Sequence, residues 1–279
     1  MKINLAKSAG FCFGVKRAIG IALEVADHEK NVYMLGDIVH NEEVVSQIEK
    51  AGIKKIKKLH HVKSKILLIR AHGIDQSTYR KALALGYKII DATCPMVKEI
   101  HRIAQDMEKQ GYKIIVIGDR RHNEVHGIIG QLKNKAIVID NQKNIPLKTI
   151  RKTKRACVVA QSTQNIENVL AIVTRLKNHI PDLKFFNTIC RPTRLKQEEI
   201  KTLPLTNDLI IIIGSKASAN TKRLYQISKA LNKRSYWVNS KKEIRKNWLK
   251  GINSVGVTAG ASTPDSTTQE IIGYIRKIS

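Results

Sequence analysis

The stretch YKIIVIGDRRHNE, residues 112–124, changes character at its middle. Its first half is apolar and rich in β-branched residues, which is typical of a strand buried on both faces. Its second half is polar and contains His122 and Glu124. In open sheets of parallel strands, ligands bind beyond the carboxyl ends of the strands. The stretch therefore predicts a parallel α/β fold with functional side chains directly after a strand.

The same pattern recurs along the chain in three sets. The first set is YMLGDIVHN, ILLIRAHG and KIIDATCP, the second is YKIIVIGDRRHNE, ACVVAQST and KFFNTICRP, and the third is LIIIIGSKASAN and SVGVTAGAS. Two sets end on a cysteine, Cys94 and Cys190, and Cys12 could complete the third. The spacings between these cysteines, 82 and 96 residues, suit three α/β units of similar size.

The apolar runs predict ten strands, and amphipathic helical patterns lie between most of them. The predicted strands are 32–35, 66–70, 87–91, 112–118, 136–140, 156–160, 184–186, 209–213, 235–238 and 254–258. Short apolar strands that alternate with helices predict an α/β fold with mainly parallel sheets. We expect one unit at 14–95, a second at 96–192, and a third at 193–279 that residues 1–13 complete.

The chain has 279 residues and a net charge of +27, with lysine-rich runs at 54–58, 151–155 and 241–250. These runs are scattered, and aromatic residues make up only 5% of the chain, so base-stacking platforms are not expected. We interpret the charge as a solvated lysine-rich surface and expect no nucleic-acid partner. A basic nucleic-acid-binding protein remains the non-enzymatic alternative.

The longest apolar run, residues 209–213, is far too short to cross a bilayer, so no membrane association is expected. The start of the chain has no signal-peptide core, which predicts a cytoplasmic protein. Four cysteines in a chain of this length do not indicate a disulfide framework.

If the three units face one another, Cys12, Cys94 and Cys190 meet at one point. Three thiolates suit a soft metal ion or an iron–sulfur cluster. Histidine and hydroxyl side chains that follow the strands suit a ligand with phosphate groups, and the loops GSKASANT and TAGASTP lead towards helix starts that attract anions. The polar residues expected there are His40, His72, His122, Glu124, Ser162, Thr163, Ser218, Asn220 and Ser262.

Each of these features alone has a plainer explanation. A histidine after a strand often only bonds within its loop, and a loop such as GASTP often only caps a helix. A zinc-dependent hydrolase of a phosphorylated substrate could also use three cysteines and one open coordination position. The fourth cysteine, Cys157, lies inside the strand ACVVA and is interpreted as core packing.

Nine motifs together resemble the 4-hydroxy-3-methylbut-2-enyl diphosphate reductase family of the methylerythritol phosphate isoprenoid pathway. The resemblance runs from residue 9 to about residue 265, in the order of the family. The motifs are AGFCFGVKRAI, VHN, RAHG, DATCPMV, HNEVHG, AQST, NTIC, SANTKRL and VTAGASTP.

The resemblance implies three α/β units in a trefoil around a central [4Fe-4S] cluster with three protein ligands. The cluster ligands of the family fall on Cys12, Cys94 and Cys190. Its glutamate proton donor falls on Glu124, with the neighbouring hydroxyl on Ser162, and either Ser162 or Thr163 could relay the proton. The diphosphate-binding positions fall on His40, His72, His122, Ser218, Asn220 and Ser262.

The implied reaction is the reductive removal of an allylic hydroxyl from a diphosphate ester, which yields isopentenyl and dimethylallyl diphosphates. The basic surface further suggests an acidic electron donor such as ferredoxin or flavodoxin. The chain departs from the family at two motifs. Where the family usually has HPE, this chain has His122-Asn123-Glu124, and where the family often has SSN, it has Ser218-Ala219-Asn220. Neither departure removes a predicted ligand or the acid.

Overall fold

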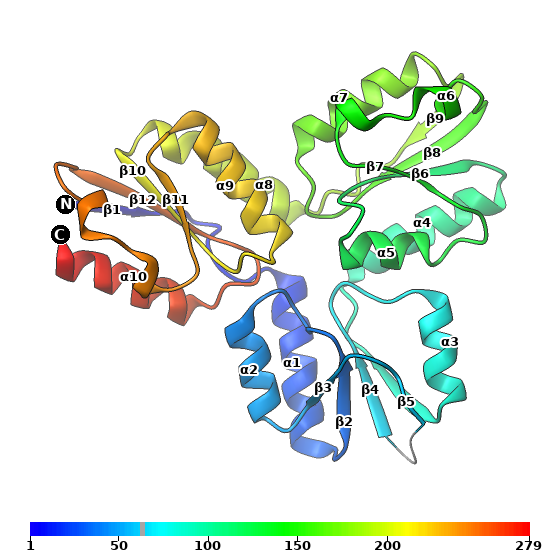
Figure 1. The fold of residues 1–279 in the computed structure, drawn as a ribbon, viewed down its shortest axis with the longest axis horizontal. Coiled ribbons are helices and arrows are strands. Elements are labelled where there is room, and N and C mark those ends of the chain that lie inside the picture. The colour runs from blue at the N-terminus through cyan, green and yellow to red at the C-terminus, as the bar shows by residue number, and fades with distance from the viewer. Residues whose placement is uncertain (62–64) are drawn as a thin grey trace. The chain divides into compact units, whose positions relative to one another are not determined.

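The structure, a computed structural model, describes residues 1–61 and 65–279 (Figure 1). Within these ranges it contains three four-stranded sheets, in which all the strand pairs are parallel. Sheet A has the order β1-β12-β10-β11, sheet B the order β3-β2-β4-β5, and sheet C the order β7-β6-β8-β9. The predicted α/β fold with parallel sheets is confirmed.

The strands are β1 (Lys2–Leu5), β2 (Val32–Leu35), β3 (Lys54–Ile56), β4 (Lys65–Ile69), β5 (Tyr87–Asp91), β6 (Lys113–Ile117), β7 (Ile137–Ile139), β8 (Arg155–Ala160), β9 (Asp182–Phe185), β10 (Leu209–Ile213), β11 (Ser235–Val238) and β12 (Ser254–Ala259). The α-helices are α1 (Phe13–His28), α2 (Glu42–Lys50), α3 (Gln76–Ala84), α4 (Pro95–Lys109), α5 (Asn123–Ile129), α6 (Leu147–Ile150), α7 (Ile166–Lys177), α8 (Arg191–Thr202), α9 (Ala219–Leu231) and α10 (Asp265–Ile278). Four short 3-10 turns, η1 (Gln142–Asn144), η2 (Leu203–Leu205), η3 (Lys241–Glu243) and η4 (Lys246–Trp248), complete the described elements.

All three sheets follow one strand order. In sheets B and C the chain forms the second strand first, then the near edge strand (β3 or β7), then the third strand, and ends at the far edge with β5 or β9. Sheet A has the same order when it is read from β11, and β1 occupies its far edge. The start of the chain thus supplies the strand equivalent to those that precede Cys94 and Cys190, and Cys12 follows β1 in the same way.

Sheet C illustrates why the predicted strands are apolar throughout. Successive side chains of a strand point to opposite faces of the sheet. Ile115 and Ile117 therefore pack in the cluster that includes residues of α7, whereas Ile114 and Val116 pack in the cluster that includes residues of α4 and α5. Both faces are buried, as in most parallel sheets.

Sheet A is covered in the same way. Its odd-numbered β10 residues, Leu209 to Ile213, pack with α10, and its even-numbered ones pack with α8 and α9. Figure 1 shows α10 on one side of this sheet and α8 and α9 on the other. In sheet B, Leu67 and Tyr87 form a cluster with Ala82 of α3.

Two strands were not predicted, and β9 begins two residues earlier than expected. β1 and β3 are edge strands with exposed lysines, and β3 lies in the run KKIKK that the sequence analysis took only as charge. Edge strands are commonly short and lysine-rich, which weakens their apolar signal. β9 spans Asp182–Phe185 instead of 184–186, because its partner β8 pairs Arg155 with Asp182.

The chain forms two compact units, which are described separately below. One contains residues 1–16, 39–46 and 191–279, with sheet A, and the other contains residues 17–38 and 47–190, with sheets B and C. The three-unit division at 14–95, 96–192 and 193–279 stays a prediction.

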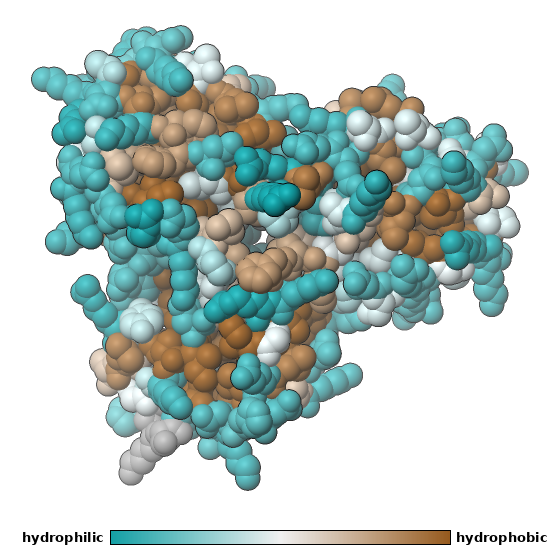
Figure 2. Space-filling model, turned by 180° about the vertical axis from the view of Figure 1, so that it is seen from behind, coloured by the Kyte–Doolittle hydropathy of each residue, from teal (hydrophilic) through white to brown (hydrophobic). Residues whose placement is uncertain are grey.

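Hydrophilic residues are spread over the whole face seen in Figure 2 and are interrupted by hydrophobic ones, rather than gathered in one region. In residues 1–61 and 65–279, no helix has both the length and the apolar character that a membrane span requires.

Candidate functional site

The three predicted metal ligands share one local position. Cys12 directly precedes α1, Cys94 precedes α4, and Cys190 precedes α8. Each is partly exposed, and none of the four cysteines is joined in a disulfide. The N-terminus of a helix carries a partial positive charge, which stabilises a thiolate. The fold therefore places three partly exposed thiols at equivalent positions, each directly before a helix.

Backbone hydrogen bonds fix each of these cysteines to the loop that follows a neighbouring strand, β12, β4 or β8. The amide of Cys12 donates to the carbonyl of Ala261 at 3.0 Å, and the amide of Val15 donates to the Cys12 Sγ at 3.4 Å. The amide of Cys94 donates to Ala71 at 3.0 Å. The amide of Cys190 donates to Ser162 at 3.1 Å. The backbone at each of the three cysteines is thus held in a defined position by a neighbouring loop.

Cys157 differs from the other three cysteines in every respect. It lies inside β8, has no exposed surface and packs in the core cluster beside α4 and α5. Burial raises the pKa of its thiol to about 12. A neutral buried thiol is a poor metal ligand, so the prediction that Cys157 is a core residue is confirmed.

Glu124 is the one buried carboxylate among the described residues, with 1% exposure. Its two oxygens accept hydrogen bonds from the same residue, from the amide of Ser162 at 2.5 Å and from the Ser162 hydroxyl at 2.8 Å. Burial raises the pKa of Glu124, and the two hydrogen bonds from Ser162 oppose this shift. The carboxyl group therefore retains its proton closer to neutral pH than an exposed glutamate does.

His122 and His72 lie in the same unit as Glu124. His122 is the N-cap of α5, and its Nδ1 accepts the amide of Glu124 at 3.2 Å. Its ring meets the His72 ring edge-on, with 5.4 Å between the centroids. Thr163 is held by a hydrogen bond from the Gln161 amide, at 3.0 Å. The structure therefore gathers two predicted phosphate-binding histidines beside the loop of the buried acid.

In the other unit, Ser218 is the N-cap of α9 and accepts the amide of Thr221 at 3.3 Å. Its hydroxyl proton can still be donated to a ligand. Asn220 is 3% exposed, and neither polar atom of its amide has a partner among the described residues. A buried amide without partners costs free energy, so Asn220 is suited to bind a polar ligand at the start of α9.

Ser262 and His40 belong to the same unit as Ser218. The Ser262 hydroxyl donates to the carbonyl of His40 at 2.9 Å. The adjacent Asn41 caps α2 through a 3.0 Å hydrogen bond from the Val44 amide. The loop after β12 and the loop before α2 are therefore joined at the predicted site residues.

The two departures from the family motifs keep the local structure. Asn123 is the first residue of α5, so the helix starts there without a proline. Ala219 is the first residue of α9 and is 7% exposed.

Sequence analysis missed Lys196, which is 2% exposed and donates to three backbone carbonyls. A signal was present, because α8 buries Thr193, Lys196, Gln197 and Ile200. These positions have the spacing of a buried helix face, yet three of the four are polar. Polar residues at core spacing indicate a specific polar contact, and here they lie just after Cys190.

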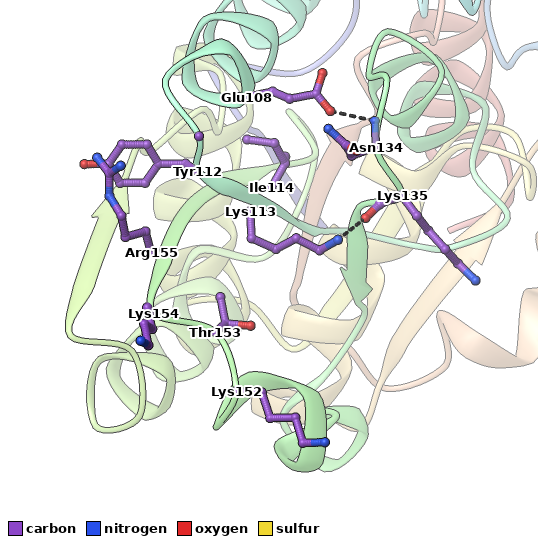
Figure 3. Close-up of a pocket in the computed structure, with 11 residues that line it drawn as sticks. Glu108, Tyr112, Lys113, Ile114, Asn134, Lys135, Lys152, Thr153, Lys154 and Arg155 are labelled. Carbon is purple, nitrogen blue, oxygen red and sulfur yellow. Dashed lines mark hydrogen bonds between the residues drawn. The ribbon is translucent and has the colours of Figure 1, made fainter.

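A separate basic cavity of about 520 Å³ lies at the amino-terminal ends of β6 and β8 (Figure 3). Its basic residues are Lys113, Lys135, Lys152, Lys154 and Arg155. Its one carboxylate, Glu108, accepts the amides of Lys133 and Asn134 at 2.9 and 2.7 Å. The cavity contains none of the predicted site residues, and it lies at the end of the strands opposite to Glu124.

The three parallel sheets, the three cysteines before helices and the one buried carboxylate of the described residues define the class of protein: an α/β protein built on parallel sheets. Residues 3–276 match the family described as LytB protein. The chain belongs to this family.

Relatives match along almost their whole length. The 4-hydroxy-3-methylbut-2-enyl diphosphate reductases of Geobacter metallireducens and Clostridioides difficile are each 38% identical to the chain, and they cover all of it with 98% and 100% of their own length. A relative of the same name from Aquifex aeolicus is 38% identical over 99% of this chain and 96% of its own length.

Two solved structures are similar. One, titled as (E)-4-hydroxy-3-methyl-but-2-enyl diphosphate reductase, the terminal enzyme of the non-mevalonate pathway, has a TM-score of 0.72 and 37% identity, and it covers 99% of this chain and 100% of its own. The other, titled as the E-1-hydroxy-2-methyl-but-2-enyl-4-diphosphate reductase from Plasmodium falciparum, has a TM-score of 0.90 and 31% identity, and it covers 98% of this chain and 87% of its own.

Proposed function

We propose that this chain reduces 4-hydroxy-3-methylbut-2-enyl diphosphate to isopentenyl and dimethylallyl diphosphates, as the last enzyme of the methylerythritol phosphate pathway. The substrate loses its allylic hydroxyl, and two electrons and two protons give one C–H bond and one molecule of water. The observation that carries this proposal is the recurrence of a partly exposed cysteine before α1, α4 and α8, in a chain 38% identical over its full length to reductases of this name.

An iron–sulfur cluster fits these residues, and Cys12, Cys94 and Cys190 would hold it. Thiolates are the ligands that such clusters use, and each of these three cysteines is partly exposed directly before a helix. When bound by three cysteines, a [4Fe-4S] cluster would supply electrons and keep one coordination position open for a ligand. Cys157 is unsuited to be a fourth ligand, because it is buried and its pKa is raised to about 12.

The diphosphate would be held by His40, His72, His122, Ser218, Asn220 and Ser262. The buried Asn220 amide without partners supports this assignment. The Ser218 side chain, which caps α9 and keeps its own proton for donation, also supports it. Helix starts favour anions through their partial positive charge.

Glu124 would donate the proton that lets the hydroxyl leave as water. Its raised pKa keeps the carboxyl group protonated closer to neutral pH, as a general acid requires. The Ser162 hydroxyl, 2.8 Å from the Glu124 Oε2, can both accept and donate a proton. Ser162 would therefore relay the proton, and Thr163 would extend the hydroxyl-bearing wall of this loop.

The electrons would come from an acidic protein such as ferredoxin or flavodoxin. The net charge of +27 supports this choice, because opposite charges accelerate the encounter of two proteins. The cytoplasmic location and the absence of a nucleic-acid partner stay predictions.

The test is a cysteine series purified without oxygen. Cys12→Ser, Cys94→Ser and Cys190→Ser should each lose most of their iron, their acid-labile sulfide and nearly all reductase activity, because serine is a poorer ligand for iron than a thiolate. Cys157→Ser is the matched control and should keep all three.

Mössbauer spectra of the wild-type protein, with and without substrate, would report the iron directly. Zinc in place of iron and sulfide would contradict the proposed reaction and favour a hydrolase. A colourless Cys157→Ser protein would contradict the ligand assignment.

A further inference from the structure

Lys196 is the only lysine or arginine that is buried among the described residues, with 2% exposure. Its ammonium donates hydrogen bonds to three backbone carbonyls, those of Ser8, Gly10 and Ala259. The distances to Gly10 and Ala259 are 3.0 and 3.1 Å. Three acceptors match the three N–H donors of an ammonium group. Lys196 therefore connects α8 to the loop after β1 and to the end of β12.

Glu199 contacts the same loop from the next turn of α8. Its carboxylate accepts the amides of Lys7 and Ser8 at 2.9 and 2.8 Å, and also the Ser8 hydroxyl. Residues three positions apart lie on one face of a helix. One face of α8 thus binds residues 7–10 in two ways. The Lys196 ammonium donates to carbonyls of this loop, and the Glu199 carboxylate accepts from its amides.

The bound loop leads directly to Cys12. Gly10 has φ +88°, and a Cβ at this position would lie 2.4 Å from the Asp265 Oδ1. Only glycine readily fits both the backbone and the space. The amide of Cys12 is then tied to Ala261. The segment from Gly10 to Cys12 is therefore short and held at both ends, by Lys196 at Gly10 and by Ala261 at Cys12.

Packing alone does not explain a lysine at this position. Burying an ammonium group is costly unless it is fully hydrogen-bonded, and apolar residues fill such space at lower cost. Lys196 and Glu124 are the two buried charged side chains of the described residues. Since Glu124 has a role in the proposed chemistry, Lys196 also calls for a functional explanation.

We propose that Lys196 and Glu199 are positioning residues that form a clamp, which holds Cys12 in place as a cluster ligand. Lys196 also places a fixed positive charge on the backbone that leads to this ligand. The inference rests on the proposed function. The potential of an iron–sulfur cluster depends on nearby charge and hydrogen bonds, so the clamp acts on both the retention and the potential of the cluster.

The test compares four variants of the full chain, all purified and loaded without oxygen. Lys196→Gln removes the charge and one or more of the donors, whereas Lys196→Arg keeps the charge and several N–H donors. Glu199→Gln weakens the other half of the clamp. Arg194→Gln is the matched control, because it removes an exposed positive charge from the same helix.

Three quantities are measured: bound iron and sulfide, the rate of iron loss to a chelator, and the reduction potential. Lys196→Gln should lose iron at least several-fold faster than Arg194→Gln, and its potential should shift to more negative values. Lys196→Arg should restore the wild-type potential. Glu199→Gln should lose iron faster without the full shift in potential, because the ammonium remains.

Wild-type retention and potential in folded Lys196→Gln would overturn the clamp. Should Lys196→Gln not fold, Glu199→Gln decides, and iron loss at the rate of Arg194→Gln would overturn the clamp. A wild-type protein that binds no iron and sulfide would instead overturn the proposed function, and the clamp with it. The two failures are therefore distinguishable.

Discussion

At the scale of single residues, the pairing of Glu124 with Ser162 is the most informative contact. One serine supplies both hydrogen bonds to a carboxylate that water does not reach. Burial raises the pKa of Glu124 and favours the protonated acid, which is the opposite of the effect of a salt bridge on a surface glutamate. A surface role in pairing with lysines, the plainer explanation for a loop glutamate, does not fit this burial.

The variant Glu124→Gln tests the role of this acid. The amide keeps the shape and a hydrogen bond but cannot donate an acidic proton, so single turnover should slow by roughly 10²-fold or more. Iron and sulfide content should match the wild type. Asp119→Asn, the same change of a carboxylate to an amide in the loop before α5, serves as the control and should turn over normally. A wild-type rate in Glu124→Gln with an intact cluster would place the proton donor elsewhere.

The resemblance to the family predicts the roles of these residues, and those roles stay predictions, but it does not predict their environments. The sequence placed Glu124 two residues after His122, and both were expected beyond one strand. It could not indicate that Ser162, 38 positions later, supplies both partners of the acid. That contact exists because β6 and β8 are adjacent and parallel, so the loops that follow them emerge side by side.

At the scale of elements, two glycines differ in whether the structure has room for a side chain at their position. Gly260 follows β12, and a Cβ there would lie 2.0 Å from the Oγ1 of Thr221 in α9, which is fully buried. Gly20 lies in the middle of α1, and nothing lies within 4 Å of a Cβ at that position. The first glycine permits close contact of a loop with a helix, whereas the second only weakens its helix.

Alanine at the two positions should therefore change stability in opposite directions. Gly260→Ala should lower the free energy of unfolding by about 1–3 kcal/mol, because the new methyl group overpacks a fixed site. Gly20→Ala should raise it by about 0.5–1 kcal/mol, because alanine favours the helix. Urea unfolding of both variants measures the two effects. A Gly260→Ala protein as stable as the wild type would show that Thr221 can move aside.

His101 of α4 connects elements of sheets B and C. A Cβ at Gly73 would lie 3.0 Å from its Cε1, and a Cβ at Gly127 of α5 would lie 3.4 Å from its Nε2. Burial lowers the pKa of His101 to about 4. Between pH 4 and pH 6.5, the ring is therefore mostly neutral in the folded protein and mostly charged in the unfolded chain. This histidine stabilises the fold above its unfolded pKa of about 6.5, and the stability is lost as the pH falls towards 4.

This linkage predicts acid sensitivity. Between pH 7.5 and pH 5, His101 should remove about 2 kcal/mol from the free energy of unfolding, because the unfolded chain binds the extra proton. Urea titrations at several pH values would measure this slope, and His101→Gln should reduce it. His126→Gln is the control, because His126 lies on the exposed side of α5, where its ring contacts the carbonyl of Arg120. An equal slope in the wild type and in His101→Gln would rule out this histidine as the acid-sensitive group.

At the scale of the whole molecule, the net charge of +27 is the least explained property. Hydrophilic residues are spread over the face in Figure 2 and alternate there with hydrophobic ones. A basic cavity is lined by the start of β6 and β8 (Figure 3). Long-range attraction depends on this total charge and is screened by salt over about 10 Å at 0.1 M. The charge therefore affects the encounter with a partner more than the fold.

The salt dependence of turnover tests the acidic electron donor. With ferredoxin or flavodoxin as the reductant, the rate should fall by on the order of tenfold between low and moderate ionic strength, because steering is screened. With a small chemical reductant, the rate should fall much less. Parallel salt profiles for the two reductants would remove the case for steering and leave biased composition as the explanation.

The sequence alone determined the alternation of strands and helices, since buried parallel strands are apolar throughout and helices repeat every 3.6 residues. It also placed Cys94, Cys190, the predicted site histidines and Glu124 after predicted strands, because the order of residues fixes which side chain follows which element. Only the tertiary structure decided which strand lies at each edge of a sheet. β1 and β3 lack a clear apolar signal because an edge strand is half exposed, and β1 finds its place by pairing with β12, some 250 residues later. The burial of Lys196 likewise depends on three carbonyls from two distant segments, and no local pattern encodes such a contact.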